Sequence, residues 1–242
     1  PATLLFTPDN WHQTQTVVFS AAEDDDGLPD QATFTFTADG FPEETLDVTA
    51  LDFDKFMVNT LQDVVASDGL TSLREVLQAA NSNAPVNEAP AGWATERDLI
   101  QFDMVALQAE AGPGNIPTIT LSGTQLSITD DVVILGPGAD QLIIDAAAQS
   151  RVIYIGDGFE ETVLDVAISG LTVTGGAVGD EMRGGGIYND QETLELNGIA
   201  VLANTAYLGG GICSEYGMLS ISNSTLSGNS AEFGGGIYSS DG

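Results

Sequence analysis

The amino-acid sequence predicts an all-β protein: a right-handed parallel β-helix, or solenoid, with a short N-terminal capping α-helix, preceded by an incomplete β-sandwich. Three observations lead to this fold class. A glycine triplet followed by isoleucine occurs at residues 184–187, 209–212 and 234–237, a spacing of 209 − 184 = 25 and 234 − 209 = 25 residues, which is typical of a repeat array. Between the triplets apolar residues alternate with small polar ones, as they do in strands. No apolar stripe at helical spacing occurs there, which favours coils made of strands stacked ~4.8 Å apart.

The residues between the triplets keep the same register. A leucine-rich repeat has a compatible period, but its leucine-rich consensus and its helical segment are absent. The triplets predict a corner that needs positive φ or a sharp bend. A recurring asparagine predicts a second corner, with left-handed backbone and an amide that bonds to its neighbour in the next coil. The pairs that lie 25 residues apart are Leu194 and Leu219, Leu196 and Ile221, Val201 and Leu226, Asn204 and Asn229, Ala206 and Ala231, and Leu208 and Phe233.

Cys213 occupies the slot that Tyr188 and Tyr238 occupy in the neighbouring repeats. It is the only cysteine of the sequence, so no disulfide can form within the chain. A slot shared with aromatic residues indicates a packing role rather than a nucleophile.

The composition is strongly acidic. Five Lys and Arg oppose 36 Asp and Glu, which gives a formal net charge of −31 and a pI near 4.1. Such a field repels nucleic acid and anionic membranes and attracts cations, so nucleic-acid binding is excluded. The acidity by itself is typical of a solvated surface in salty or calcium-containing surroundings. Disorder does not follow, because hydrophobic residues make up 43% of the chain and are patterned.

The sequence offers no membrane-spanning segment, because it lacks an apolar run of ~18 residues. Pro1 is not followed by the basic and apolar regions of a signal peptide. The chain starts within a pattern and stops within a repeat. We therefore expect a piece of a longer chain, whose signal peptide and any anchor lie outside it.

Residues 1–54 differ from the repeats and predict part of an antiparallel β-sandwich. Alternating segments at 33–37 and 45–49 indicate half-buried strands. Residues 5–19, which include Trp11, are followed by an acidic run. This stretch of sequence resembles the C-terminal part of a Calx-beta-like, immunoglobulin-fold module of bacterial surface proteins. The resemblance covers about the first 50 residues of a ~100-residue sandwich, so the missing strands would come from upstream.

The acidic run is the best metal candidate in the sequence. Ca²⁺ takes six to eight oxygen ligands, which clustered carboxylates on a loop can supply. Calx-beta modules bind calcium through such loops, so the resemblance implies Ca²⁺ here; a merely solvated loop is the alternative. The candidate ligands are Glu23, Asp24, Asp25, Asp26 and Asp30.

From Lys55 the pattern changes to that of the solenoid, assigned to residues 55–242. Residues 56–60 predict a strand, and Ser72 with Glu75 forms a capping box that starts a helix. The helix has one apolar face, which suits it to cover the first coil and shield its free edge. That face consists of Leu73, Val76, Leu77 and Ala80.

The start of this helix resembles the CSLREA segment of bacterial β-helix surface proteins, which carry choice-of-anchor or polymorphic outer-membrane-like repeats. Residues 72–75 match, while Thr71 and Val76 replace the Cys and Ala of the family. The resemblance runs from about Phe56 to the end of the sequence. Arg74 is expected to bind a nearby carboxylate or loop carbonyl rather than to catalyse.

The segment between the helix and the regular repeats predicts less regular coils. Residues 82–97 indicate a long surface loop, residues 136–138 a turn, and residues 177–183 an insertion. Strands are expected at 99–102, 118–121, 125–128, 132–135, 142–144 and 152–155, with 164–173 leading into the repeats.

Many parallel β-helices cleave acidic polysaccharides, so a calcium-dependent polysaccharide lyase is the alternative function. A lyase needs a strong base beside carboxylates that hold calcium against a uronate. The candidate base is Arg151, with Asp145, Asp157, Asp130 and Asp131 nearby in sequence or one coil away. No repeated pair of carboxylates of the kind that a hydrolase uses is present.

The favoured interpretation is a non-catalytic extracellular protein of the bacterial cell surface. A rigid, calcium-stabilised rod of stacked coils suits adhesion or matrix assembly, with self-association, neighbouring surface proteins or glycans as partners. In a variant, an uncapped coil end accepts a strand of the next subunit and builds a filament. The flanking sequences would test both versions, since the sequence does not name a ligand.

Overall fold

The computed structural model describes residues 10, 12, 30–37, 44–50, 55–159, 163–179 and 182–240. The chain divides into two compact units, residues 1–52 and residues 53–242. In the first unit, β1 (Asp30–Phe36) pairs antiparallel with β2 (Glu44–Ala50), so that Asp30 lies opposite Ala50. This strand pair fits an incomplete sandwich. Phe36 and Leu46 remain exposed on it.

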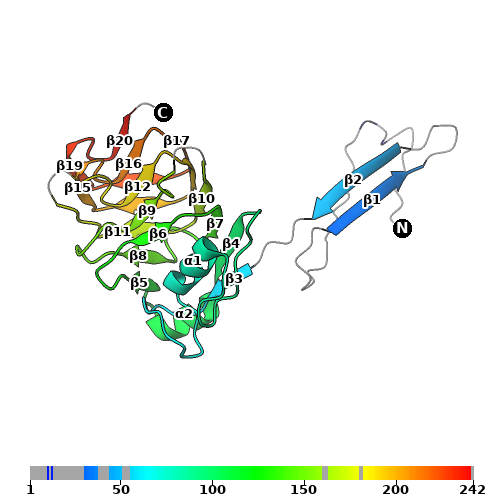
Figure 1. Ribbon diagram of the computed structural model, residues 1–242, viewed down its shortest axis with the longest axis horizontal. Helices are drawn as coiled ribbons and strands as arrows, with labels where there is room; N and C mark the ends of the chain where they lie inside the picture. Colours follow the sequence, from blue (N-terminus) through cyan, green and yellow to red (C-terminus); the bar gives the residue numbers. More distant parts are fainter. Residues whose placement is uncertain are drawn as a thin grey trace. The chain divides into compact units, whose positions relative to one another are not determined.

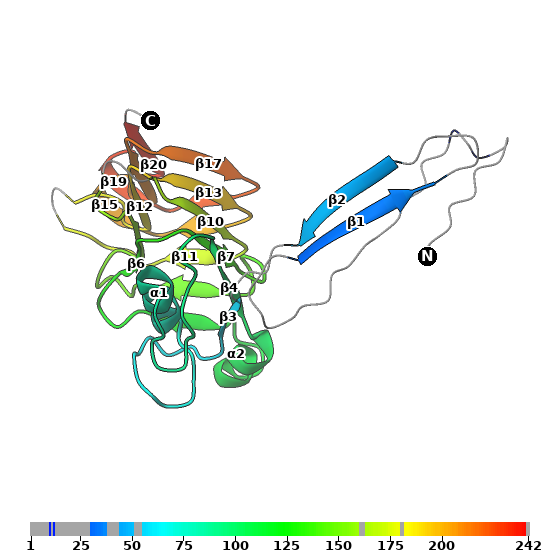
Figure 2. The same ribbon diagram turned by 45° about the vertical axis from the view of Figure 1, so that its right-hand side comes forward.

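The second unit is the predicted parallel β-solenoid (Figures 1 and 2). In each coil the chain passes from a first sheet to a second and then to a third, so that like strands stack in parallel. Sheet 1 contains β3 (Lys55–Val58), β4 (Asp98–Phe102), β7 (Val132–Leu135), β10 (Asp165–Ser169), β13 (Thr193–Asn197) and β17 (Met218–Ser222). Sheet 2 contains β5 (Thr118–Thr120), β8 (Ile143–Asp145), β11 (Thr172–Thr174), β14 (Ala200–Leu202) and β18 (Thr225–Ser227). Sheet 3 contains β6 (Leu126–Ile128), β9 (Ile153–Ile155), β12 (Ile187–Asp190), β16 (Ile212–Glu215) and β20 (Ile237–Ser240).

A short fourth sheet contains β15 (Thr205–Leu208) and β19 (Ser230–Phe233). It begins where the expected insertion lies, because Ala177 bridges to Thr205 and Arg183 bridges to Leu208. The insertion thus takes the place of a strand in the coil below β15.

The core consists of columns of like residues, as the 25-residue period predicts. Ile187, Ile212 and Ile237 are direct partners in sheet 3. Leu194 pairs with Leu219 in sheet 1, and Val201 and Leu226 pair in sheet 2. Burying one such side chain contributes roughly 1.5–3 kcal/mol, so the stacked columns account for much of the stability of the solenoid.

The glycine triplets form a corner for two separate reasons. The first glycine of each triplet has positive φ, +57° at Gly184, +60° at Gly209 and +65° at Gly234, a conformation that costs glycine nothing. The third glycine is needed for close approach, since a Cβ on Gly186 would lie 2.6 Å from the carbonyl oxygen of Gly211 in the next coil.

The expected asparagine corner is confirmed in part. The amide of Asn204 bonds to that of Asn229, with Nδ2 3.1 Å from Oδ1. The left-handed backbone, however, lies at Ala203 (φ +53°), not at the asparagine, so that part of the prediction was wrong. Asn204 contributes its buried side-chain amide instead, which bonds to Gly176 N and Val173 O of the preceding coil.

Two helices lie among the described residues. The capping helix α1 (Leu73–Ser82) begins at the predicted capping box, since Ser72 Oγ accepts from the Glu75 amide and the Glu75 carboxylate accepts from the Ser72 amide. The second helix, α2 (Met104–Ala111), was not expected. The Asp103 carboxylate caps it by accepting from the amides of Val105 and Ala106. Its sequence has no distinct apolar face, which is why pattern alone does not reveal it.

Candidate functional site

The predicted calcium ligands remain a prediction. Glu23, Asp24, Asp25 and Asp26 lie outside the described residues, and Asp30 starts β1. Over the described ranges of the chain, no group of three or more His, Cys, Asp or Glu side chains is arranged to hold a metal ion.

Arg151, the candidate base of the lyase hypothesis, is buried and holds coils together. Its Nε donates to the carbonyl oxygens of Arg183 (3.0 Å) and Gly184 (2.8 Å), and Nη2 donates to Arg183 O (2.6 Å). Its Nη1 donates to Gln125 Oε1 at 2.6 Å. Within the described part of the chain, all its hydrogen bonds thus go to carbonyl or amide oxygens and none to an aspartate. Burial lowers the pKa of the guanidinium below its ordinary value, yet such a group stays protonated near neutral pH.

The four aspartates named with Arg151 have separate local roles. Asp145 Oδ1 accepts from the Ala147 amide at 2.7 Å, and Asp157 Oδ1 accepts from the Phe159 amide at 2.8 Å. Both are turns of the kind that Asp forms with the backbone two residues on. Asp130 and Asp131 lie in the connection from β6 to β7, and their side chains contact the end of the capping helix and the next coil, respectively. Asp130 Oδ2 accepts from Asn83 Nδ2 (2.7 Å), whereas Asp131 Oδ1 accepts from the Asp165 amide (2.8 Å).

The outer face of sheet 3 carries a polar ladder that the sequence analysis did not anticipate. Tyr154 Oη donates to Asp190 Oδ2 at 3.1 Å, and Tyr188 Oη donates to Glu215 Oε2 at 2.9 Å, each one coil further on. Arg183 forms an ion pair with Glu215. The guanidinium of Arg151 lies 5.8 Å from the ring centre of Tyr154 and 5.1 Å from that of Tyr188, within the range of cation–π attraction.

The pKa shifts of Tyr154, Tyr188 and Cys213 keep these three groups protonated near neutral pH. Burial raises the pKa of Tyr154, and burial together with the hydrogen bond to Glu215 raises that of Tyr188. Burial, with Glu215 nearby, raises the pKa of the Cys213 thiol to about 12. Cys213 is fully buried, as expected of a packing residue, and a thiol with that pKa is a poor nucleophile. Burial also raises the pKa of Glu192, and it outweighs the hydrogen bonds from the backbone amides of Leu164 and Asp157, which lower that pKa.

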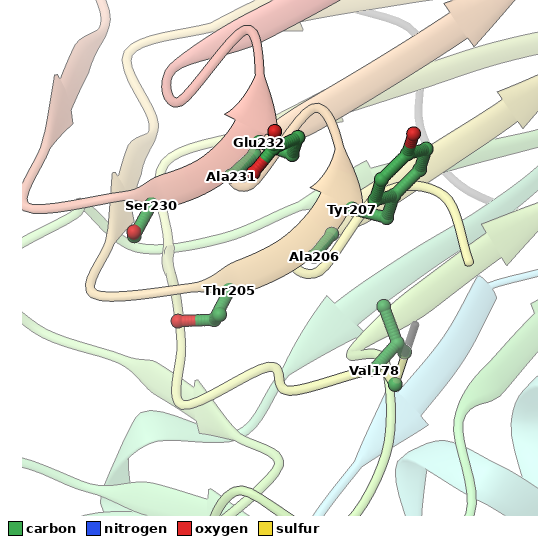
Figure 3. Close-up of a pocket in the computed structure, with 8 residues that line it drawn as sticks. Val178, Thr205, Ala206, Tyr207, Ser230, Ala231 and Glu232 are labelled. Atoms are coloured by element: carbon green, nitrogen blue, oxygen red, sulfur yellow. The ribbon is translucent and has the colours of Figure 1, made fainter. Parts of the chain in front are cut away.

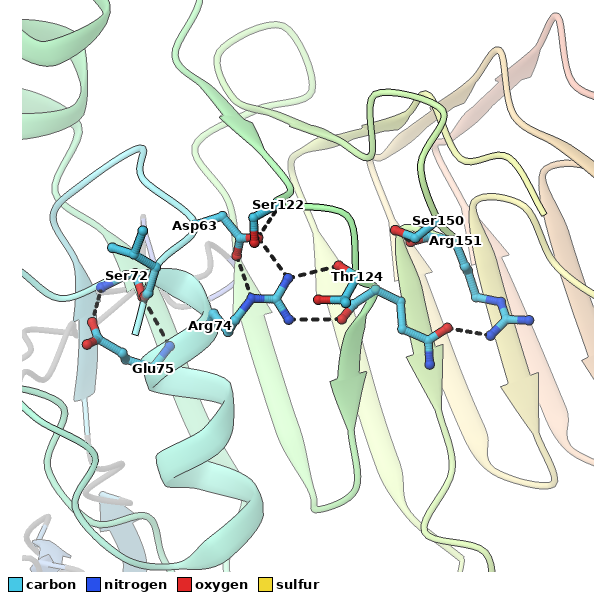
Figure 4. Close-up of polar contacts among 10 residues, drawn as sticks. Asp63, Ser72, Arg74, Glu75, Ser122, Thr124, Ser150 and Arg151 are labelled. Atoms are coloured by element: carbon cyan, nitrogen blue, oxygen red, sulfur yellow. Dashed lines mark hydrogen bonds and ion pairs between the residues drawn. The ribbon is translucent and has the colours of Figure 1, made fainter. Parts of the chain in front are cut away.

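The N-terminal end of the solenoid is the most elaborate polar site of the described structure (Figure 4). Arg74 of α1 donates to the buried Asp63 from two of its three nitrogens, Nε to Oδ1 at 2.7 Å and Nη2 to Oδ2 at 2.8 Å. Asp63 also accepts from the amide (2.6 Å) and hydroxyl (2.9 Å) of Ser122. Burial raises the pKa of Asp63, but the hydrogen bonds from Arg74 and Ser122 outweigh it, so the pKa lies below its ordinary value.

The helix α1 also covers the free edge of β6, the strand at the N-terminal edge of sheet 3. Arg74 donates to the carbonyl oxygens of Thr124 (2.9 Å) and Gln125 (3.0 Å). Asn81, seven residues on and therefore on the same helix face, donates from Nδ2 to Ser127 O (2.9 Å) and accepts the Thr129 amide at Oδ1 (2.8 Å). An amide side chain here pairs with the strand much as another strand would. The expected carboxylate and carbonyl partners of Arg74 are confirmed.

Glu75 adds a second buried carboxylate to this end. Besides the capping box, its Oε1 accepts from the Ala66 amide (2.9 Å) and Asn87 Nδ2 (2.8 Å), which fixes two loops against the helix. Burial raises the pKa of Glu75, and these hydrogen bonds lower it further than burial raises it. Sequence analysis identified Glu75 and Arg74 but missed Asp63 and Asn81; the seven-residue spacing of Asn81 from Arg74 is the signal that could have indicated it.

A hollow of about 350 Å³ lies beside the short fourth sheet (Figure 3). Val178 of the insertion forms one side, and Thr205, Tyr207, Ser230 and Glu232 are among the residues of β15 and β19 that line the rest. Tyr207 and Phe233 pack edge to face with ring centroids 5.6 Å apart. Hydroxyl, carboxylate and exposed aromatic groups meet here, a combination that can contact the hydroxyls and apolar faces of a sugar.

At the other end of the solenoid, β17, β18, β19 and β20 are the terminal strands of their sheets. Large apolar side chains remain exposed in this coil: Ile237 (41%), Phe233 (49%) and Met218 (67%). The described structure therefore has one end covered by a helix and one end with open strand edges.

Comparison of the chain with protein-family models, with curated proteins and with solved structures gives no match. The stacked parallel sheets establish the β-solenoid. Among the described helices, none is both long enough and apolar enough to cross a membrane.

Proposed function

We propose that this protein is a non-catalytic structural and adhesive rod of the bacterial cell surface, related to CSLREA-type β-helix proteins and preceded by a Calx-beta-like module. The observation that carries the proposal is the use made of the buried polar side chains. Arg74 and Asn81 bind the edge of the first complete coil, Arg151 joins three coils, and Asn204 joins its coil to both neighbours. Side chains that serve coil stacking in this way favour a mechanical role over catalysis.

The electrostatics support an extracellular setting. A chain of net charge −31 has strong self-repulsion at low ionic strength, which salt or divalent cations relieve. The proposed Ca²⁺ at Glu23, Asp24, Asp25, Asp26 and Asp30 would stiffen the first unit. Melting with and without Ca²⁺ tests this, with the double variant Asp24→Asn, Asp25→Asn as the matched protein. A melting temperature that Ca²⁺ leaves unchanged in both proteins would remove the metal from the proposal.

The adhesive part of the proposal places ligand contact at the hollow beside the short fourth sheet. Because the chain is anionic, we expect neutral glycans rather than polyuronates. Binding of the labelled chain to an array of neutral and acidic glycans tests this, with Tyr207→Ala as the site variant and Phe159→Ala, an exposed aromatic elsewhere, as the control. Saturable binding that Tyr207→Ala weakens at least tenfold and Phe159→Ala leaves intact is the expected result.

The lyase alternative has its own decisive assay. Polyuronates incubated with the chain and Ca²⁺ are expected to give no unsaturated-uronide absorbance. Absorbance that appears and is lost in an Arg151→Ala variant with native circular dichroism would contradict the non-catalytic proposal.

A further inference from the structure

A buried carboxylate, Glu192, binds the connection between β9 and β10 near both of its ends. Glu192 lies in the turn between β12 and β13 and is 1% exposed. Its Oε2 accepts from the Leu164 amide at 2.6 Å, and its Oε1 accepts from the Asp157 amide at 3.4 Å. A single side chain of one coil therefore fixes where the connection of the preceding coil begins and where it ends.

The backbone of Glu192 is itself held in place. Its carbonyl oxygen accepts from Asn189 Nδ2 at 2.8 Å and from the Met218 amide at 3.0 Å. Gly217 packs directly against it, since a Cβ on Gly217 would lie 2.4 Å from that oxygen. Because the turn is fixed from within its own coil and by the next one, a change in the charge of the carboxylate acts on the connection rather than on the turn.

Two further carboxylates surround Glu192. Burial is the largest cause of its raised pKa, and the negative charges of Asp157 and Asp190 raise that pKa in addition. The amides of Leu164 and Asp157 lower the pKa, but by less. The ionised form of Glu192 is therefore desolvated and lies near two like charges, which makes it costly to keep in this position.

The other charged and titratable groups of the neighbouring strands are engaged elsewhere. Tyr154 of β9 donates to Asp190, and Arg151 lies over the Tyr154 ring. Glu215 of the next coil pairs with Arg183. Within the described part of the chain, no ion pair involves Glu192. Its negative charge is thus met by backbone amides but by no cation.

The direction of the pH effect follows from this environment. When the connection moves away, water reaches Glu192 and the pKa of its carboxyl returns toward the ordinary value of about 4.3. A pKa that is higher in the closed form than in the open form means that the proton favours the closed form. The closed form is therefore favoured below the ordinary pKa, and that advantage is lost as the pH rises through the raised one.

We propose that Glu192 is a pH-sensitive anchor, which holds the connection at Asp157 and Leu164 tightly in acid and more weakly once the carboxyl ionises at higher pH. Phe159 and Val163, which are 68% and 63% exposed, lie on this connection. Its ends thus respond to pH without any metal or ligand. The inference goes beyond the surface role proposed above and does not depend on it.

The test is amide hydrogen exchange of the 242-residue chain, followed by NMR between pH 4 and pH 7. Each rate is divided by that of an unstructured amide at the same pH, which gives a protection factor. The protection of the Leu164 amide should fall as the pH rises. Glu192→Gln cannot ionise and should lose this pH dependence, whereas Glu195→Gln, which removes an exposed carboxylate of β13, should keep it.

Protection of Leu164 that is constant or rises with pH would overturn the proposal, and so would an unaltered pH dependence in Glu192→Gln or its loss in Glu195→Gln. Should Glu192→Gln fail to fold, Asp190→Asn decides. That variant keeps an acceptor oxygen for Tyr154 but removes a like charge near Glu192, so the midpoint of the fall in protection should move to lower pH. A midpoint that stays in place would overturn the proposal.

Discussion

The first and the last described coils of the solenoid differ in what lies against their strand edges. A strand at the edge of a stack of coils has backbone groups without a strand partner. At the β6 end, Asn81 and Arg74 supply the missing donors and acceptor from a helix. At the β20 end the described strands are open and the core column reaches the surface at Ile237.

Covering the edge of the first coil requires polar side chains as well as an apolar helix face. The apolar face of α1 contributes burial, but the strand edge beneath it requires hydrogen bonds. Those come from a buried ion pair and an amide, which are costly to desolvate and stabilise only when fully bonded. Removing these hydrogen bonds should therefore lower the free energy of unfolding strongly at the covered first coil. Comparable substitutions in the last described coil should lower it less.

The largest effect is expected for Arg74→Ala. It leaves the Asp63 carboxylate buried without its ion-pair partner and frees two carbonyls of the β6 edge, which should lower the free energy of unfolding by about 3–5 kcal/mol. Urea unfolding measures it. The matched control is Arg97→Ala, whose ion pair with Asp165 is exposed on both sides (39% and 54%) and is expected to contribute at most about 1 kcal/mol. Equal losses in the two variants would mean that α1 does not cover the edge as described.

The next largest difference in the free energy of unfolding is expected between substitutions at two stacked glycines, Gly211 and Gly236. Gly211→Ala forces a Cβ to within 2.5 Å of a backbone carbonyl oxygen and should destabilise the fold by about 1–3 kcal/mol or more. Gly236→Ala meets nothing and should leave the free energy of unfolding of the single chain unchanged or raise it by about 0.4–1 kcal/mol. Both changes in the free energy of unfolding are measured by urea unfolding. A loss at Gly236 as large as that at Gly211 would contradict the open end.

A smaller difference is expected between the two stacked asparagines of the second corner, Asn204 and Asn229. Asn204 is buried and its amide bonds to Gly176 N, Val173 O and Asn229, so Asn204→Ala should cost about 1–3 kcal/mol. Asn229 lies in the outermost coil and is half-buried, so Asn229→Ala should cost about half as much. Thermal unfolding of the two variants gives the ratio, and a reversed order would contradict the stacking direction.

Acidification should give the smallest of these effects. The folded-state pKa values of Asp63 and Glu75 lie below their ordinary values. Their contribution to stability is therefore present above the unfolded-state pKa of about 4 and is lost as the pH falls through the lowered folded-state values. Urea unfolding between pH 6 and pH 3 measures the slope. Glu75→Gln should make that slope shallower, and an unchanged slope would show that Glu75 does not contribute.

Much of the fold follows from spacing alone. Residues 25 apart are strand partners, as Leu194 with Leu219 and Cys213 with Tyr238 show, because identical coils stack in register. The strands expected between residues 99 and 155 agree with the observed ones to within one residue, for example 152–155 against Ile153–Ile155, whereas the strand expected at 33–37 begins three residues earlier, at Asp30. The capping box was recognisable because Ser72 and Glu75 act over three residues of sequence.

The parts that sequence did not reveal depend on contacts between distant residues. Asp63 meets Arg74 and Ser122 across 11 and 59 residues, and no local pattern marks an isolated aspartate for burial. The ladder of Tyr154 and Asp190 spans 36 residues across an irregular insertion. The left-handed backbone lies at Ala203, a residue type that rarely adopts it. The adjacent Asn204 uses its side-chain amide for hydrogen bonds to the preceding coil.

The most direct measurement of how α1 covers the first coil is amide hydrogen exchange of the 242-residue chain, followed by mass spectrometry. Peptides from α1 and β6 should be strongly protected, because Arg74 and Asn81 hold the helix on the strand edge, whereas peptides from residues 217–240, whose described strands have one open edge, should exchange faster. Exchange of α1 and β6 as fast as that of residues 217–240 would contradict the account.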